Sequence, residues 1–145
     1  MNTRLRFSLF VSLGLFLHGA QAQAAAAGAP FVPEPILPGG IVLSLFPPDS
    51  PHLKKDRISE PEKLNTQGGG NGKTTNVINI HNPSIEAHPL DAGGSNTGAA
   101  VIVVPGGGHK ILWVGPEGAD FVPFFKEYGV STIILRNRLR VDGYI

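Results

Sequence analysis

The sequence predicts an α/β fold built around one strand–helix–strand unit, and three segments carry this prediction. Residues 99–104 (AAVIVV) are continuously apolar, which is typical of a strand buried on both faces of a parallel sheet. Aromatic residues within 121–128 follow the i, i+3, i+4, i+7 spacing of one helical face. These are Phe121, Phe124, Phe125 and Tyr128. Residues 130–135 (VSTIIL) form a second apolar strand, so a right-handed crossover and a parallel sheet are expected.

The helix of this unit has two possible starting points. It can open at Pro116 or at Asp120, and Pro123 fits the first turn if Asp120 is the N-cap. Gly129 is placed to end the helix.

Composition limits the function classes. The chain has 145 residues, a net charge of +1 and no cysteine, which allows one domain without disulfides or thiolate metal sites. The balanced charge argues against nucleic acid as a partner. With 19 glycines and 13 prolines, long irregular stretches are expected beside any core.

The first residues have the pattern of a secretory signal peptide, assigned to residues 1–22. A short basic start precedes an apolar stretch, residues 7–17, that is too short to span a bilayer. Small residues then offer cleavage after Ala22 or Ala24, with an uncleaved anchor as the alternative. We therefore expect export to the periplasm or the extracellular space, with no stable membrane anchor after cleavage.

Two further parts are expected after the signal peptide. Residues 23–73 are rich in proline and glycine and predict a flexible arm, although residues 41–46 can lie against a domain surface. Residues 74–145 predict the folded domain. Its first strand covers residues 77–80, and residues 84–88 can pair beside it.

The most informative residues are Gly106, Gly107 and Gly108, which follow the buried strand directly. Three glycines let the backbone turn sharply and expose amide groups, which can stabilise a developing oxyanion. The same geometry can hold a phosphate, and a plain tight turn is the third interpretation.

The segment that contains these glycines resembles the N-terminal half of α/β-hydrolases of the acetylxylan-esterase and lipase-like kind. The resemblance covers about Asn76 to Ile145 and rests on three elements in the family's order: residues 105–108 (PGGG), 117–118 (EG) and 137–139 (NRL). It implies an α/β-hydrolase sheet that is incomplete here, with the early strands and one strand–helix–strand unit.

The sequence departs from the family pattern at three positions. Pro105 stands where many esterases have histidine, His109 where an aromatic residue is common, and Asn137 where tyrosine is usual. None of these changes touches the backbone amides of the three glycines, so the oxyanion-hole role implied for the glycines is kept.

The resemblance implies ester hydrolysis by a serine, histidine and acidic triad, with the serine in a G-x-S-x-G turn. The 145 residues contain no such motif, and the nearest variant, around Ser95, precedes the glycine-loop strand. We therefore expect the nucleophile and its partners beyond Ile145, and this chain alone to be inactive. On this interpretation it is a truncated N-terminal fragment.

Other residues are weaker candidates. His109 and Trp113 can contact substrate, although an exposed loop position for His109 and packing of Trp113 on Phe121 or Phe124 are the alternatives. Arg138 is the best of three alternating arginines for substrate binding. The other two are Arg136 and Arg140, and all three can instead pair with Glu117 or Asp120.

Two patterns suggest ligands but are better explained otherwise. Residues 68–74 (GGGNGKT) resemble a phosphate loop, but Gln67 stands at its first glycine. His81, Glu86 and His88 suggest a metal site, but a strand would separate His81 from the others, so a solvated surface is expected.

The predicted function is a secreted serine ester hydrolase, present as a fragment that carries the oxyanion-hole glycines. Its substrate would be an ester such as an acetylated carbohydrate, with no cofactor and no metal. The alternatives are a non-catalytic exported remnant or binding protein, and a phosphate-binding module.

Overall fold

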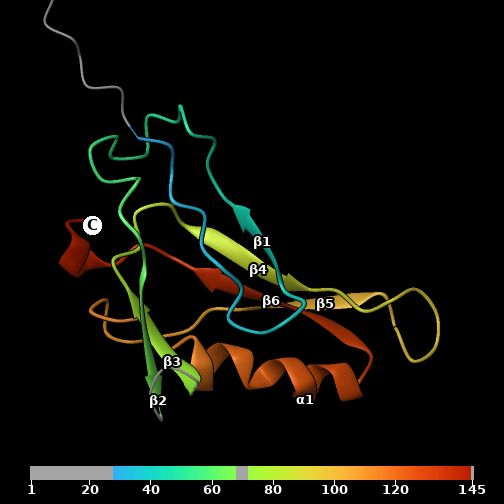
Figure 1. The fold of residues 1–145 in the computed structure, drawn as a ribbon. Coiled ribbons are helices and arrows are strands. Elements are labelled where there is room, and N and C mark those ends of the chain that lie inside the picture. Colours follow the sequence, from blue (N-terminus) through green and yellow to red (C-terminus); the bar gives the residue numbers. More distant parts are fainter. Residues whose placement is uncertain (1–27, 68–71, 145) are drawn as a thin grey trace, which may run out of the picture.

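The computed structural model describes residues 28–67 and 72–144, and these form a mixed α/β fold. They contain a four-stranded sheet, a two-stranded sheet and a single α-helix (Figure 1). The predicted mixed α/β content and partial sheet are confirmed. The predicted signal peptide lies outside the described residues.

The four-stranded sheet has the order β1-β4-β6-β5. Its strands are β1 (Ile41–Ser44), β4 (Ser84–His88), β5 (Ala99–Val103) and β6 (Val130–Arg136). β5 and β6 run parallel, whereas β1 with β4 and β4 with β6 are antiparallel.

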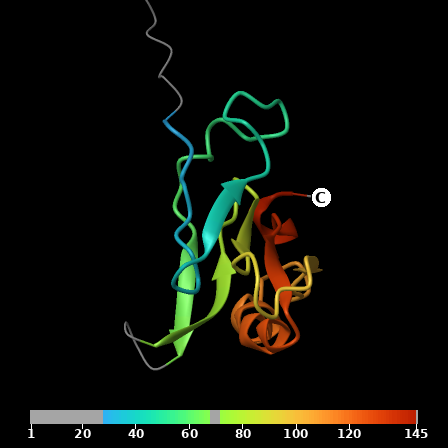
Figure 2. The same ribbon diagram turned by 90° about the vertical axis from the view of Figure 1, so that its right-hand side faces the viewer.

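The predicted strand–helix–strand unit is present. A π-helical turn, η1 (Gly115–Ala119), leads into α1 (Phe121–Glu127), which packs against β6 (Figure 2 views α1 nearly along its axis). Asp120 is the N-cap, as one of the two predicted starts requires. Gly129 has φ +70° after the helix, and a Cβ there would lie 1.8 Å from the carbonyl oxygen of Ser95. No helix among the described residues is long and apolar enough to cross a membrane.

The second sheet is an antiparallel pair, β2 (Lys63–Gln67) and β3 (Lys73–Ile78). Val77 of β3 also bridges to Leu112, beyond the glycine loop. A small core forms at this junction. Its buried members are Val77, Ile80, Leu112, Val114 and Leu139. The core therefore joins β3 to the segment that follows the glycine loop and to the residues after β6.

Residues 84–88 were expected beside the strand at 77–80, and this pairing is wrong. β4 lies between β1 and β6, and β3 pairs with β2 instead. Asn79 takes a left-handed conformation (φ +64°) that ends β3 and redirects the chain before β4 begins.

The segment predicted as a flexible arm, residues 23–73, contributes both β1 and β2. The prolines stand outside the ladder of β1, where a missing N–H costs nothing. The backbone amides of Ile36 and Leu37 donate to the carboxylate of Glu86 at 2.8 and 3.1 Å. These long-range contacts fasten the segment to the sheet, and its composition alone does not reveal them.

One face of the four-stranded sheet is apolar and uncovered by the described residues. Strand alternation and register place one set of side chains on this face. It consists of Ile41, Leu43, Ile85, Ala87, Ile102, Ile133 and Leu135. We call this set the open apolar face. Ile102 is 63% exposed, so the prediction that its strand is buried on both faces is wrong. β1 and β5 form the two edges of this sheet.

Candidate functional site

The glycine loop that follows β5 adopts a conformation that needs glycine. Gly107 has φ +140°, and a Cβ there would lie 2.0 Å from the carbonyl oxygen of Ile111. Gly108 has φ +61° with open space around it, and His109 also has a left-handed φ of +58°. Successive left-handed residues form a tight turn at the carboxyl end of a parallel strand, where α/β folds place their ligands.

Hydrogen bonds hold the loop and decide which of its amides are available. The amide of Gly106 donates to Oε2 of Glu117 at 2.6 Å, and its carbonyl accepts from the amide of Trp113 at 3.0 Å. Within residues 28–67 and 72–144, the amides of Gly107 and Gly108 donate no hydrogen bond. Of the three predicted oxyanion donors, Gly106 is therefore engaged by Glu117, and Gly107 and Gly108 are free.

The loop borders a cavity of about 260 Å³. Its walls include all three glycines, and its far side is formed by Leu135, Asn137 and Leu139. A cavity of this size accommodates a small acyl group, and Gly107 and Gly108, whose amides donate no hydrogen bond within the described residues, are among its lining residues.

A second cleft of about 600 Å³ adjoins the first. It is lined by His109, Asn137, Arg138, Arg140 and Tyr144. His109 and Asn137 line both spaces, so the two spaces are neighbours that share these residues. We call the larger space the basic cleft, because two arginines lie in its wall and no acidic side chain does.

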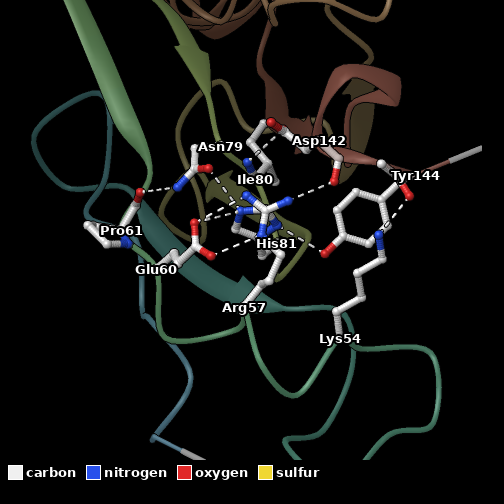
Figure 3. A network of polar contacts seen from close by, with 10 residues as sticks. Lys54, Arg57, Glu60, Pro61, Asn79, Ile80, His81, Asp142 and Tyr144 are labelled. Atoms are coloured by element: carbon white, nitrogen blue, oxygen red, sulfur yellow. Dashed lines mark hydrogen bonds and ion pairs between the residues drawn. The ribbon is translucent and has the colours of Figure 1, made fainter.

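Behind the basic cleft lies a polar network around His81, whose side chain is 1% exposed (Figure 3). Nε2 of His81 is 2.9 Å from Oδ1 of Asn79, and Nδ1 is 3.0 Å from the hydroxyl of Tyr144. Because an amide oxygen only accepts, Nε2 carries the proton and the Tyr144 hydroxyl donates to Nδ1. The imidazole is thus held neutral, and it positions the ring of Tyr144 at the cleft.

Charges near His81 shift several pKa values. Burial lowers the pKa of His81 below its ordinary 6.5, and the Arg57 guanidinium lowers it further. The hydrogen bond from Arg57 lowers the pKa of Glu60 to about 2. Burial raises the pKa of Tyr144 above its ordinary 10.0, which keeps its hydroxyl protonated as a donor. The network therefore keeps a single protonation state at neutral pH.

A second buried network lies across the sheet and corrects two predictions. Arg136 is fully buried, donates to Glu86 and Glu62, and donates to the carbonyl of Glu34 at 2.7 Å. It does not pair with Glu117 or Asp120 as expected. Glu86 is also fully buried, with Oε1 2.9 Å from Nε2 of His88, so these side chains are not a solvated strand surface.

This second network ties the segment before β1 to the sheet. Burial raises the pKa of Glu62, while Arg136 opposes that shift.

No group of three or more potential metal ligands occurs in residues 28–67 and 72–144.

No family model, curated protein or solved structure matches this chain. The function is therefore argued from the geometry of the glycine loop and its two clefts.

The structure places the remaining predicted residues as follows. Trp113 is 36% exposed and lines neither cleft. In the described part of the chain the rings of α1 contact one another instead of Trp113. Ser95 lies in the loop between β4 and β5, near Gly129 and away from the glycine loop. Residues 68–71 of the phosphate-loop pattern lie outside the described residues, although β2 does precede them.

Sequence reasoning missed three contributors to the site. Glu117 fixes Gly106, Tyr144 borders the basic cleft, and His81 positions Tyr144. His81 and Tyr144 are 63 positions apart, so no local pattern relates them. From the sequence, Glu117 is part of the family resemblance and a candidate partner for the arginines, and its distance of 11 positions from Gly106 carries no recognised motif.

Proposed function

We propose that this chain provides the oxyanion-binding part of a secreted serine ester hydrolase. The observation that carries the proposal is the pair of free amides, Gly107 and Gly108, beside a small cavity at the carboxyl end of β5. The substrate is an ester with a small acyl group, such as an acetylated carbohydrate. The proposal also draws on the resemblance to the N-terminal half of α/β-hydrolases.

The chemistry assigned to the two amides is electrostatic. When a serine oxygen attacks the ester carbonyl, the carbonyl π electrons move to oxygen and a tetrahedral oxyanion forms. Amide donors held ready for that oxygen stabilise the transition state, and removing one such donor costs about 3 kcal/mol in well-studied hydrolases. Glu117 takes up the amide of Gly106 and holds the loop, so its neighbours need no rearrangement to donate.

The proposal requires a nucleophile that this sequence does not supply as G-x-S-x-G. In the α/β-hydrolases that this sequence resembles, the nucleophile lies on a strand that comes after the glycine loop in the chain. We therefore assign the serine, the acid and the histidine to sequence that follows Ile145 in the gene product.

The test begins with the DNA beyond codon 145. We expect an open frame with G-x-S-x-G, followed by an acidic residue and a histidine. The product of that frame is expected to hydrolyse 4-nitrophenyl acetate, and the 145-residue chain is expected not to. A stop codon directly after Ile145, or turnover by the 145-residue chain itself, would contradict the proposal.

A second candidate function is a non-catalytic binding protein. It is favoured by the open apolar face, where Leu43 and Ile102 are 52% and 63% exposed. Large apolar patches of this kind mark interaction surfaces. A stop codon after Ile145 together with a monodisperse complex that Ile102→Lys dissociates would favour this function over hydrolysis.

A further inference from the structure

The basic cleft has a feature that ester hydrolysis alone does not require. A ligand whose carbonyl oxygen meets Gly107 and Gly108 lies beside His109 and Asn137, which line both spaces. The far wall of the basic cleft then presents Arg138 and Arg140 to the rest of that ligand. The charge of this part of the ligand is therefore the property that these two residues can distinguish.

Arg138 is held in place by neighbouring groups. Its guanidinium lies 4.6 Å from the ring centroid of Tyr144 and 5.6 Å from that of Phe46. Nη1 also donates to the carbonyl of His52. A guanidinium has five N–H donors, so this arrangement orients the group and leaves donors for a ligand. Because these aromatic contacts already order the Arg138 side chain, less of its conformational entropy is lost when a ligand binds.

Arg140 adds a second positive charge without a counter-charge. It forms no ion pair with any residue in the described part of the chain. The neighbouring carboxylate of Asp142 accepts from the amide of Ile80 at 3.2 Å and does not line the cleft. The cleft therefore has a net positive wall with free guanidinium donors.

We propose that the basic cleft binds an oxyanion group, a carboxylate or a phosphate monoester, carried by the ester substrate. The assignment of this group to an ester rests on the proposed function, whereas the anion site itself does not. Planar guanidinium groups bind carboxylate and phosphate oxygens in pairs, and this bidentate geometry is their strongest interaction. A substrate with an anionic substituent is thus preferred over a neutral one.

The test is binding of small probes to the purified chain, followed by nuclear magnetic resonance of the ring protons of Tyr144 and His109. Benzoate and phenyl phosphate are compared with benzamide, which has nearly the same shape as benzoate and no charge. We expect benzoate or phenyl phosphate to bind at least about tenfold more tightly than benzamide. The tighter of the two anions identifies the carboxylate or the phosphate as the preferred group.

The decisive variant is Arg140→Gln, with Lys63→Gln as the control. Both residues are exposed cations, so neither change should affect folding, but Lys63 lies on β2 and does not line the cleft. We expect Arg140→Gln to weaken anion binding about tenfold and to leave benzamide unchanged. We expect Lys63→Gln to change neither.

Two results would overturn the inference: equal binding of benzoate and benzamide, or equal anion binding by Arg140→Gln and the unmodified chain. Because this assay needs no nucleophile, its failure leaves the proposed hydrolysis untouched. In the same way, a stop codon after Ile145 would remove the hydrolysis and leave an anion site that this assay still measures.

Discussion

At the scale of single residues, the two buried polar networks have different tasks. Arg136 and Glu86 join the segment before β1 to the centre of the four-stranded sheet. His81 joins the C-terminal residues to β3 and positions Tyr144 at the basic cleft. Both use side chains that composition would place at the surface, because charged groups are rarely buried unless they are paired.

Removing one partner of the buried ion pair between Arg136 and Glu86 should destabilise the folded chain. We expect Arg136→Ala to lower the free energy of unfolding by about 3–5 kcal/mol, because Glu86 would keep a buried charge without its counter-ion. The control is Lys73→Ala, whose ion pair with Asp120 has side chains 57% and 43% exposed. We expect Lys73→Ala to lower the free energy of unfolding by less than about 1 kcal/mol. Urea denaturation measures both, and equal losses would show that Arg136 is not a structural centre.

The neutral state of His81 makes stability depend on pH. In the unfolded chain the imidazole takes up a proton near its ordinary pKa of 6.5, whereas burial lowers the pKa in the folded chain. The stabilisation is therefore complete above about pH 6.5 and is lost as the pH falls toward the lowered value.

We expect the urea midpoint to decrease as the pH is lowered below about 6.5, and His81→Gln to reduce this pH dependence. His52→Gln is the control, because His52 is an exposed histidine in a turn. A slope that His81→Gln leaves unchanged would assign the pH dependence to other groups.

At the scale of elements, β5 and β6 show how position in a sheet decides the role of similar sequences. Both are apolar and β-branched, and they pair in parallel with Ile102 opposite Ile133. Ile134 of β6 points toward η1 and is fully buried, whereas Ile102 of β5 lies on the open apolar face. The sequence pattern alone assigns both strands to the interior of a sheet, because it does not show which face of the sheet other segments cover.

The difference in burial predicts a difference in stability. Ile134→Ala should lower the free energy of unfolding by about 2–5 kcal/mol, since it leaves a cavity beside Gly118. Ile102→Ala removes the same atoms from a side chain that is 63% exposed, so it should cost less than about 1 kcal/mol. Similar losses in urea denaturation would mean that a further segment covers the open apolar face.

At the scale of the whole molecule, the sequence predicts the local units better than their arrangement. The strand–helix–strand unit, the Asp120 cap and the sharp turn at the glycines follow from spacing and residue type, and the structure contains them. β1, β2 and the two buried networks depend on contacts between residues that are far apart in the chain, such as Ile36 with Glu86. No local period encodes such contacts, so composition alone suggested an arm.

The candidate site likewise has one part that the sequence predicts and another part that only the folded structure shows. The glycine loop was predicted because three consecutive glycines after an apolar strand form a local signal. The engagement of Gly106 by Glu117 and the contribution of Tyr144 to the basic cleft emerge only when the chain is folded. In the folded structure, two of the three predicted oxyanion donors keep a free amide within the described residues. The folded structure also gives the neighbouring basic cleft a positively charged wall.

The measurement that tests the oxyanion role most directly is kcat for 4-nitrophenyl acetate in the full gene product with Gly107→Ala or Gly129→Ala. Both changes place a Cβ against a carbonyl oxygen, at 2.0 and 1.8 Å, so both strain the backbone alike. Only Gly107→Ala moves the oxyanion donors, and we predict that it lowers kcat about 100-fold while Gly129→Ala keeps the activity of the folded fraction. Equal kcat in the two variants, or no hydrolysis by the full gene product, would contradict the account.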